Sequence, residues 1–290
     1  MKDAPAAPRA LLLEELRRPG PLVTVELRPP PSDLQGADGM SAWIDLHHAL
    51  RRLAEAERFV FLTDNAVGAA EEESLVHVGS NVEEEVDRRR IVPMLTCKHT
   101  LDYCLLFASR AVSQGFDAMT VLGGDKDVGP PRCVPHAQDL RAMVRKRLPE
   151  LALGGWVNPH KAPETQLGYL SALESHADFG LTQIVSHHAP EQVEALLEAR
   201  ERLGVTQPLV FGVFYYRSAN PRTLSMLGEF LPVPADALTR EFEAEDDAEE
   251  ICARTIRRLR ALGADKVYVS NLGNGGAHRR LARILERVER

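Results

Sequence analysis

The sequence contains few cysteines, and they follow no regular spacing. Only four occur in 290 residues, at Cys97, Cys104, Cys133 and Cys252. No two of them form the C-x-x-C pair typical of zinc knuckles, and four scattered cysteines do not make a disulfide framework. We therefore expect a protein of a reducing compartment that holds no metal through cysteine.

Long hydrophobic runs and an excess of positive charge are also missing. The apolar run Ala10–Leu13 is followed at once by Glu14 and Glu15, which makes it too short and too charged for a secretory signal. No segment approaches the roughly 18 consecutive apolar residues of a membrane-spanning helix. The net charge is −7, whereas nucleic acids and anionic membranes attract clustered positive charge. These absences predict a cytoplasmic protein that binds small molecules, and they indicate no oligomeric state.

What the sequence does contain is a series of eight apolar runs with amphipathic segments between them. Each run is nearly continuous in apolar residues, as in parallel strands that are covered on both faces. Eight strand–helix units of roughly 30 residues predict an α/β protein with one (β/α)8 TIM barrel, as a single domain over residues 1–290. The runs lie at residues 22–27, 58–64, 91–97, 118–124, 151–157, 179–185, 209–215 and 266–272.

Three further segments lie outside this repeat. The segment Leu11–Gly20 predicts a short helix over the closed end of the barrel, and Pro221–Phe230 predicts an extra helix before the last strand. The acidic run Glu241–Glu250 is typical of a solvated helix start, because acidic residues favour a helix N-terminus. We expect no chemistry in this run.

In a barrel of this kind the active site lies at the C-terminal ends of the strands, so the residues there are the first candidates. Gly123 and Gly124 end the fourth run without side chains, which lets a flat ligand approach the backbone, and Asp125 follows within reach of that ligand. The alternative is an ordinary turn in which Asp125 caps the next helix. Glycines and aspartate together favour a binding site.

Two more strand residues carry chemistry. Glu26 lies inside an apolar run, where burial would raise its pKa and suit it to general acid catalysis; the alternative is an outward-facing residue paired with Arg28. Gln183 ends another apolar run and offers both donors and an acceptor to a heterocycle, or else serves as a satisfied polar group in the barrel. Tyr215 and Asn271 also end strands and are candidate substrate contacts.

The order and spacing of six segments resemble 5,10-methylenetetrahydrofolate reductase, over nearly the whole chain from Leu22. The segments are V-E-L-R-P-P from Val25, P-M-L-T-C from Pro93, L-G-G-D from Leu122, A-D-F-G-L-T-Q from Ala177, G-V-F-Y-Y with L-P-V-P-A-D-A-L from Gly212, and V-Y-V-S-N from Val267.

The resemblance implies an oxidoreductase that converts 5,10-methylenetetrahydrofolate into 5-methyltetrahydrofolate. Glu26 matches the family's general acid, which protonates N10 and opens the five-membered ring to a 5-iminium cation. Asp125 matches the aspartate that stabilises this cation, and Gln183 matches a pterin-binding glutamine. The readings from physical chemistry and from the resemblance select the same three residues.

Several positions depart from the family's flavin site. Met94 replaces a histidine, Gly123 an arginine and Trp156 a tyrosine, Ala172 lies near the position of a usual lysine, and V-N-P-H-K replaces P-E-x-H-P, although His160 remains. Losing several such contacts would weaken FAD binding by orders of magnitude. The sequence is similar to flavin-independent actinobacterial members, which implies direct hydride transfer from NADH or NADPH.

No G-x-G-x-x-G follows a strand, so the nicotinamide is expected at the barrel mouth. Candidate contacts with it are Thr63, Asn65, Thr96, Lys98, Gly123, Gly124, Trp156 and His160. Lys98 and Arg217 are candidate contacts for the 2′-phosphate of NADPH. The alternative is that each is an ordinary exposed cation. The sequence does not separate NADH from NADPH.

Three other readings stay open. One is an FAD-dependent reductase, and a second is a folate-binding barrel that has lost catalysis, against which the retained Glu26 argues. The third is a metal-dependent hydrolase using His160, His187, His188 and Asp125. The first strand lacks the His-x-His usual in such hydrolases, and adjacent side chains such as His187 and His188 tend to point apart. We therefore predict no metal site.

Overall fold

Eight parallel strands form a closed barrel, as the apolar runs predict. The computed structural model describes residues 9–31, 33–34, 36–63, 86–125, 129–244 and 246–290. Every strand pairs with its neighbours in the chain, and β1 closes the ring against β8, with Val23 opposite Val267. The strands are β1 Leu22–Leu27, β2 Val60–Leu62, β3 Ile91–Thr96, β4 Ala118–Leu122, β5 Ala152–Val157, β6 Phe179–Val185, β7 Leu209–Phe214 and β8 Lys266–Ser270.

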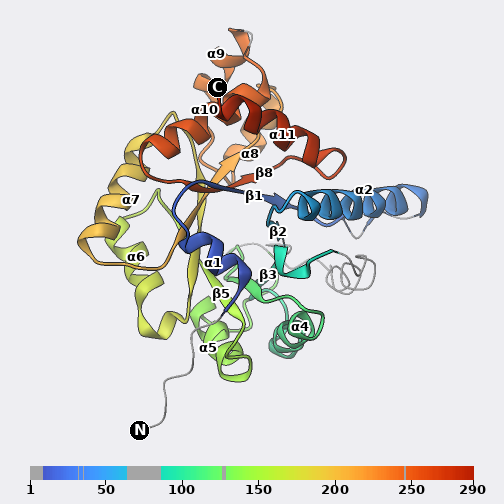
Figure 1. Ribbon diagram of the computed structural model, residues 1–290, viewed down its shortest axis with the longest axis vertical. Helices are drawn as coiled ribbons and strands as arrows, with labels where there is room; N and C mark the ends of the chain where they lie inside the picture. Colours follow the sequence, from blue (N-terminus) through green and yellow to red (C-terminus); the bar gives the residue numbers. More distant parts are fainter. Residues whose placement is uncertain (1–8, 32, 35, 64–85, 126–128, 245) are drawn as a thin grey trace.

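Helices surround the barrel, and α2 reaches away from it (Figure 1). None of the helices in the described residues is long and apolar enough to cross a membrane. They are α1 Leu11–Arg17, α2 Gly36–Glu55, α4 Leu101–Ser113, α5 Ala137–Arg147, α6 Pro163–Ser171, α7 Pro190–Arg202, α8 Pro221–Gly228, α9 Ala235–Glu243, α10 Ala248–Ala261 and α11 Ala277–Val288, with short 3-10 turns at Arg88–Arg90 and Leu173–Ser175.

Large side chains fill the interior of the barrel. Phe61, Phe179 and Tyr268 are fully buried inside the ring. Two strand glycines make room for them: a Cβ on Gly154 would lie 2.6 Å from the Phe179 ring, and one on Gly212 would lie 2.5 Å from the Tyr268 hydroxyl. Close packing therefore requires glycine at both positions.

The helix α1 closes the opposite end of the barrel, as predicted. Leu12, Leu13 and Leu16 are buried in the same cluster as the aromatic residues of the interior. The Leu11 amide donates a 2.8 Å hydrogen bond to the Asp117 carboxylate just before β4, which fixes the start of the helix. Helix α1 thus covers the N-terminal end of the barrel.

The chain between β7 and β8 forms α8 and α9, which pack beside that C-terminal end. Leu224 of α8, Leu238 of α9 and Ile251 of α10 share a small apolar cluster with Tyr216. The prediction for the acidic run is correct in its second half, since Asp247 caps α10 by accepting from the Glu250 amide. Its first half is wrong, because Glu241 belongs to the end of α9.

Candidate functional site

A cavity of about 1010 Å³ opens at the C-terminal ends of the strands. Its walls come from residues at or just after the ends of all eight strands, from Ala42 of α2, and from α8 and the loop after it. This size is at the upper end of the range typical of ligand pockets. The predicted residues that line it are Glu26, Thr63, Thr96, Gly123, Gly124, Asp125, Trp156, Gln183 and Asn271.

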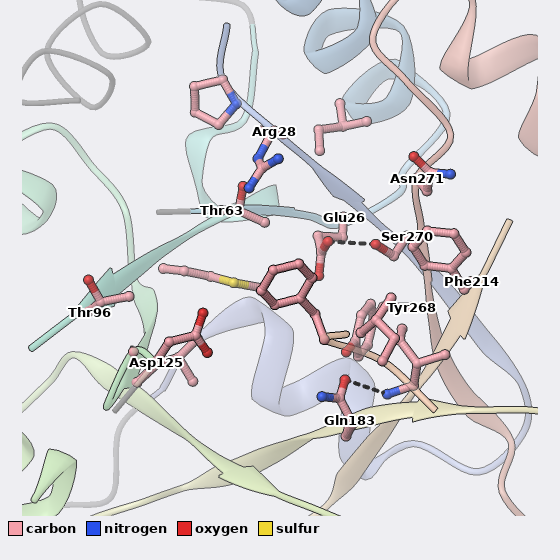
Figure 2. Close-up of a pocket in the computed structure, with 18 of the residues that line it drawn as sticks. Glu26, Arg28, Thr63, Thr96, Asp125, Gln183, Phe214, Tyr268, Ser270 and Asn271 are labelled. Carbon is pink, nitrogen blue, oxygen red and sulfur yellow. Dashed lines mark hydrogen bonds between the residues drawn. The ribbon is translucent and has the colours of Figure 1, made fainter. Parts of the chain in front are cut away.

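Glu26 lies on the floor of this cavity and faces the barrel interior, not the helices. Its Oε1 accepts a 2.6 Å hydrogen bond from the Ser270 hydroxyl across the β1–β8 pair (Figure 2). Burial raises the pKa of Glu26, against the lowering effects of the Ser270 hydrogen bond and the Arg28 charge. A carboxyl group with a raised pKa holds its proton closer to neutral pH, as a general acid requires.

Asp125 is exposed at the end of the Gly123–Gly124 turn, and its carboxyl group points into the same space as Glu26 (Figure 2). Gly124 has a φ of 72°, a left-handed conformation that favours glycine. Helix α5 begins only at Ala137, so Asp125 does not cap it. The alternative interpretation of this turn as a helix cap is therefore wrong.

Gln183 lies on the β6 side of the cavity. Its Oε1 accepts a 2.9 Å hydrogen bond from the Ile184 amide, and its amide nitrogen faces the side on which Asp125 lies (Figure 2). The neighbouring Thr182 carbonyl accepts a 2.6 Å hydrogen bond from the buried Tyr268 hydroxyl, which fixes this part of the strand. The side chain can thus donate from a fixed position to a carbonyl or ring nitrogen.

The expected nicotinamide contacts divide into two groups. Thr63, Thr96 and Trp156 line the cavity, and Trp156 is 37% exposed, so its ring is open to a ligand. Lys98 and His160 are absent from the described lining. Lys98 is 4% exposed and donates to the Pro130 carbonyl, and the His160 ring bonds the Ile184 carbonyl at 2.7 Å. Both predictions are wrong in location, because these side chains bond nearby backbone groups.

Of the two other predicted substrate contacts, Asn271 lines the cavity and Tyr215 does not. Tyr215 follows Phe214 on β7 and therefore faces the opposite side, where it is buried between the barrel and its helices near Glu249. Its placement in the pocket was wrong for that reason. Asn271 does line the cavity, in a left-handed conformation with φ of 68°, and its side-chain nitrogen donates to the Tyr215 carbonyl. Asn65 lies outside the described residues.

Residues that the sequence did not indicate also line the cavity, and Arg132 is the most informative. Its guanidinium carbon would lie 2.8 Å from a Cβ on Gly123, and its Nη2 donates a 2.6 Å hydrogen bond to the Gly124 carbonyl. A cation therefore lies beside the position where the family resemblance marks a lost arginine. No pattern points to Arg132, since it follows β4 by ten residues in an irregular segment. Phe214, Tyr268 and Ser270 also belong to this unpredicted part of the lining. Arg217, a candidate cation for a 2′-phosphate, lines the cavity as well.

His187 and His188 lie outside this cavity and do not point apart as expected. Their rings are 3.9 Å apart, and their Nε2 atoms lie 2.8 and 3.0 Å from the two carboxylate oxygens of Glu241. These three residues are the group within the described ranges whose ligand atoms lie close enough to share a metal ion. The group excludes Asp125 and His160, which a hydrolase site would need.

Hydrogen bonds already satisfy this histidine cluster. The Thr255 hydroxyl lies 2.7 Å from His187 Nδ1, and Arg254 forms an ion pair with the same Glu241 oxygen that meets His187. A neutral His187 can accept at Nδ1 and donate from Nε2, so both of its ring nitrogens have a hydrogen-bond partner. The separations of 2.8 and 3.0 Å are hydrogen-bond distances. The cluster therefore works as a link between the β6–α7 loop, α9 and α10.

The chain resembles solved TIM-barrel structures at low sequence identity. A Rubisco-like protein from Rhodopseudomonas palustris aligns with 98% of this chain and 70% of its own, with 16% identity and a TM-score of 0.53. A protein from Aquifex aeolicus VF5 aligns over 96% and 95%, with 13% identity and a TM-score of 0.51. No protein-family model matches the chain, and no curated protein matches it in sequence. These likenesses show the fold alone.

Proposed function

We propose that the protein reduces 5,10-methylenetetrahydrofolate to 5-methyltetrahydrofolate with a hydride from NADH or NADPH. The observation that carries the proposal is Glu26, a carboxyl group with a raised pKa on the floor of a cavity of about 1010 Å³. Its proton goes to N10 of the folate, the bond from N10 to the methylene carbon breaks, and a 5-iminium cation forms. Hydride addition to the methylene carbon then completes the methyl group.

Asp125 and Gln183 support the same assignment. The Asp125 carboxylate faces the cavity and places a negative charge where the cation develops, and charge stabilisation of this kind is a large catalytic contribution. Gln183 donates from a fixed position to the pterin ring. A barrel that only binds folate needs recognition groups but has no use for a proton donor. The buried Glu26, with its raised pKa, therefore favours a reductase over a binding protein.

The residues of the β3–β5 wall decide which redox group fits. The nicotinamide supplies a hydride when bound, and Thr63, Thr96, Trp156 and the bare Gly123–Gly124 backbone are the groups that would hold it. For a flavin the wall offers Met94, which is apolar and 5% exposed, where the family has a histidine. We therefore propose that NADH or NADPH donates directly and that FAD is not needed.

One observation favours an FAD-dependent reductase as the second candidate. Arg132 brings a guanidinium group beside Gly123, which offsets in space one of the substitutions from which loss of FAD was predicted. The prediction that FAD is not needed therefore rests on the remaining substitutions, which are Met94, Trp156 and the missing lysine near Ala172.

The proposal is tested by anaerobic incubation of freshly purified protein, with its flavin content measured, with NADH and 5,10-methylenetetrahydrofolate. Loss of absorbance at 340 nm and formation of 5-methyltetrahydrofolate, followed by mass spectrometry, are expected without added FAD. Turnover only after FAD is added would favour the second candidate. Absence of turnover with NADH or NADPH, with and without FAD, would contradict both.

A further inference from the structure

Arg132 is held on the cavity wall in a way that depends on Gly123. The guanidinium carbon and Nη2 would lie 2.8 and 2.9 Å from a Cβ at that position, so any larger residue would displace the group. The hydrogen bond from Nη2 to the Gly124 carbonyl holds the guanidinium against the turn. The turn is thus shaped to seat a cation from elsewhere in the chain.

The charge of Arg132 has no carboxylate partner within ion-pair distance among the described residues. The neighbouring arginines differ from it: Arg145 pairs with Asp178, and Arg141 is buried and donates to Ser175 and to the Val121 carbonyl. A guanidinium has five N–H donors in a planar fork, and Arg132 uses one of them on the Gly124 carbonyl, while its Nε has no partner in the described part of the chain. Such a fork matches two oxygens of an anion.

The position of Arg132 in the cavity indicates which anion it binds, a diphosphate or the carboxylates of a folate. It shares the β3–β5 wall with Thr96 and the open Trp156 ring, whereas Arg28 and Arg217 line the cavity from the β1 and β7 side, near Glu26. In this arrangement the pterin lies on Glu26 and Gln183. Arg28 and Arg217 then remain for the carboxylates of the folate tail. The wall at Gly123 and Gly124 lets a diphosphate approach the backbone closely.

We propose that Arg132 binds the diphosphate of the nicotinamide nucleotide and, with the Gly123–Gly124 turn, forms the nucleotide subsite of this pocket. This inference rests on the proposed function, because it assumes that a nucleotide and a folate share the cavity. It assigns to one arginine the anchoring role that a glycine-rich Rossmann loop has in other dehydrogenases, and such a motif is absent from this sequence.

The test is isothermal titration of the full-length protein with NADH, with ADP-ribose and, separately, with 5-methyltetrahydrofolate. The variant Arg132→Gln should weaken NADH and ADP-ribose binding about 10-fold or more, since a charge-assisted contact is lost, while folate binding changes less than about twofold. The matched control Arg217→Gln removes the same charge from the opposite wall and should leave ADP-ribose binding unchanged. Thermal melting of each variant checks that it is folded.

A second variant guards against a purely structural effect of Arg132→Gln. Gly123→Ala keeps the arginine but displaces its guanidinium, so it should weaken ADP-ribose binding in the same direction. Unchanged ADP-ribose binding in both variants, absence of ADP-ribose binding by the wild type, or weakening of folate binding alone would overturn the inference. Arg132-dependent ADP-ribose binding without any formation of 5-methyltetrahydrofolate would instead leave the subsite in place and contradict the proposed reaction.

Discussion

The Ser270 hydroxyl donates a 2.6 Å hydrogen bond to Oε1 of Glu26, and so joins the ends of β8 and β1 at the floor of the cavity. Burial raises the pKa of Glu26, whereas this hydrogen bond stabilises the charged form and lowers it. The two residues together therefore set the pH range over which the acid keeps its proton.

We predict that Ser270→Ala moves the alkaline limb of the kcat profile to higher pH. A general acid works only while protonated, so kcat falls as pH rises through the pKa of Glu26, and loss of the hydrogen bond raises that pKa further. The measurement is kcat against pH for the wild type, Ser270→Ala and the control Ser270→Thr, which keeps a hydroxyl. An alkaline limb that stays in place or moves to lower pH in Ser270→Ala would contradict the role of Glu26 as the acid.

Glu26→Gln should lower kcat by about 10²- to 10⁴-fold, the usual contribution of a positioned acid. The amide keeps the shape of the side chain and can still accept from Ser270. Affinity for 5-methyltetrahydrofolate, measured by titration, should therefore change little. If affinity and turnover fall together, Glu26 has a structural role rather than a catalytic one.

Glu26 should also lower the stability of the protein at alkaline pH. Burial raises its pKa in the folded state above the ordinary value of 4.5, so its favourable contribution is present at low pH and is lost as pH rises through the folded pKa. The side chain of the Glu26→Gln variant cannot ionise. Relative to the wild type, the variant should therefore have a larger free energy of unfolding, and so be more stable, at pH 8 than at pH 5. Urea unfolding at both pH values measures the difference, and an equal difference would contradict burial of the carboxylate.

The histidine cluster should make the protein sensitive to acid. Burial lowers the pKa of His187 below 6.5. For Glu241, burial raises the pKa, but the hydrogen bonds and charges of His187, Arg254 and His188 together outweigh burial and leave the pKa below 4.5. Each pKa is lower in the folded state than in the unfolded chain, so the contribution of His187 to stability is lost as pH falls through 6.5, and that of Glu241 is lost only below pH 4.5. The melting temperature should drop between pH 7.5 and 5.5.

The variant His187→Gln isolates the first of these two titrations. It removes the group that must resist protonation, so its melting temperature should drop less than that of the wild type over the same pH range. His136→Gln is a suitable control, because His136 is exposed before α5 and lies outside the cluster. A drop in His187→Gln as large as that of the wild type would show that His187 does not cause the acid sensitivity.

The barrel could be predicted from the sequence because parallel strands covered on both faces leave an unmistakable run of apolar residues. Even the short β2 is found, although its predicted end at Asp64 exceeds the observed Leu62. Glu26, Asp125 and Gln183 could be predicted because strand ends converge in a barrel. Tyr215 could have been corrected from the sequence as well, since strand alternation with Phe214 places it outward.

Other features depend on contacts that no local pattern records. The expectation that His187 and His188 point apart holds within a strand, but these residues follow β6 in a turn, where Glu241 from a distant helix draws both rings together. The guanidinium group of Arg132 occupies space that a side chain at position 123 would fill, and only the three-dimensional arrangement shows this. Lys98 was misplaced because the carbonyl that it meets, Pro130, lies 32 residues further along the chain.

Isotope transfer tests the central claim of direct hydride donation most directly. Flavin-free protein would be given NADH with deuterium at both C4 positions and 5,10-methylenetetrahydrofolate in ordinary water, and the product methyl group would be analysed by mass spectrometry. Direct donation predicts one deuterium in the methyl group of each 5-methyltetrahydrofolate molecule. A product without deuterium, or a product that forms only when FAD is added, would contradict the account, because reduced flavin exchanges its hydrogen with water before transferring it.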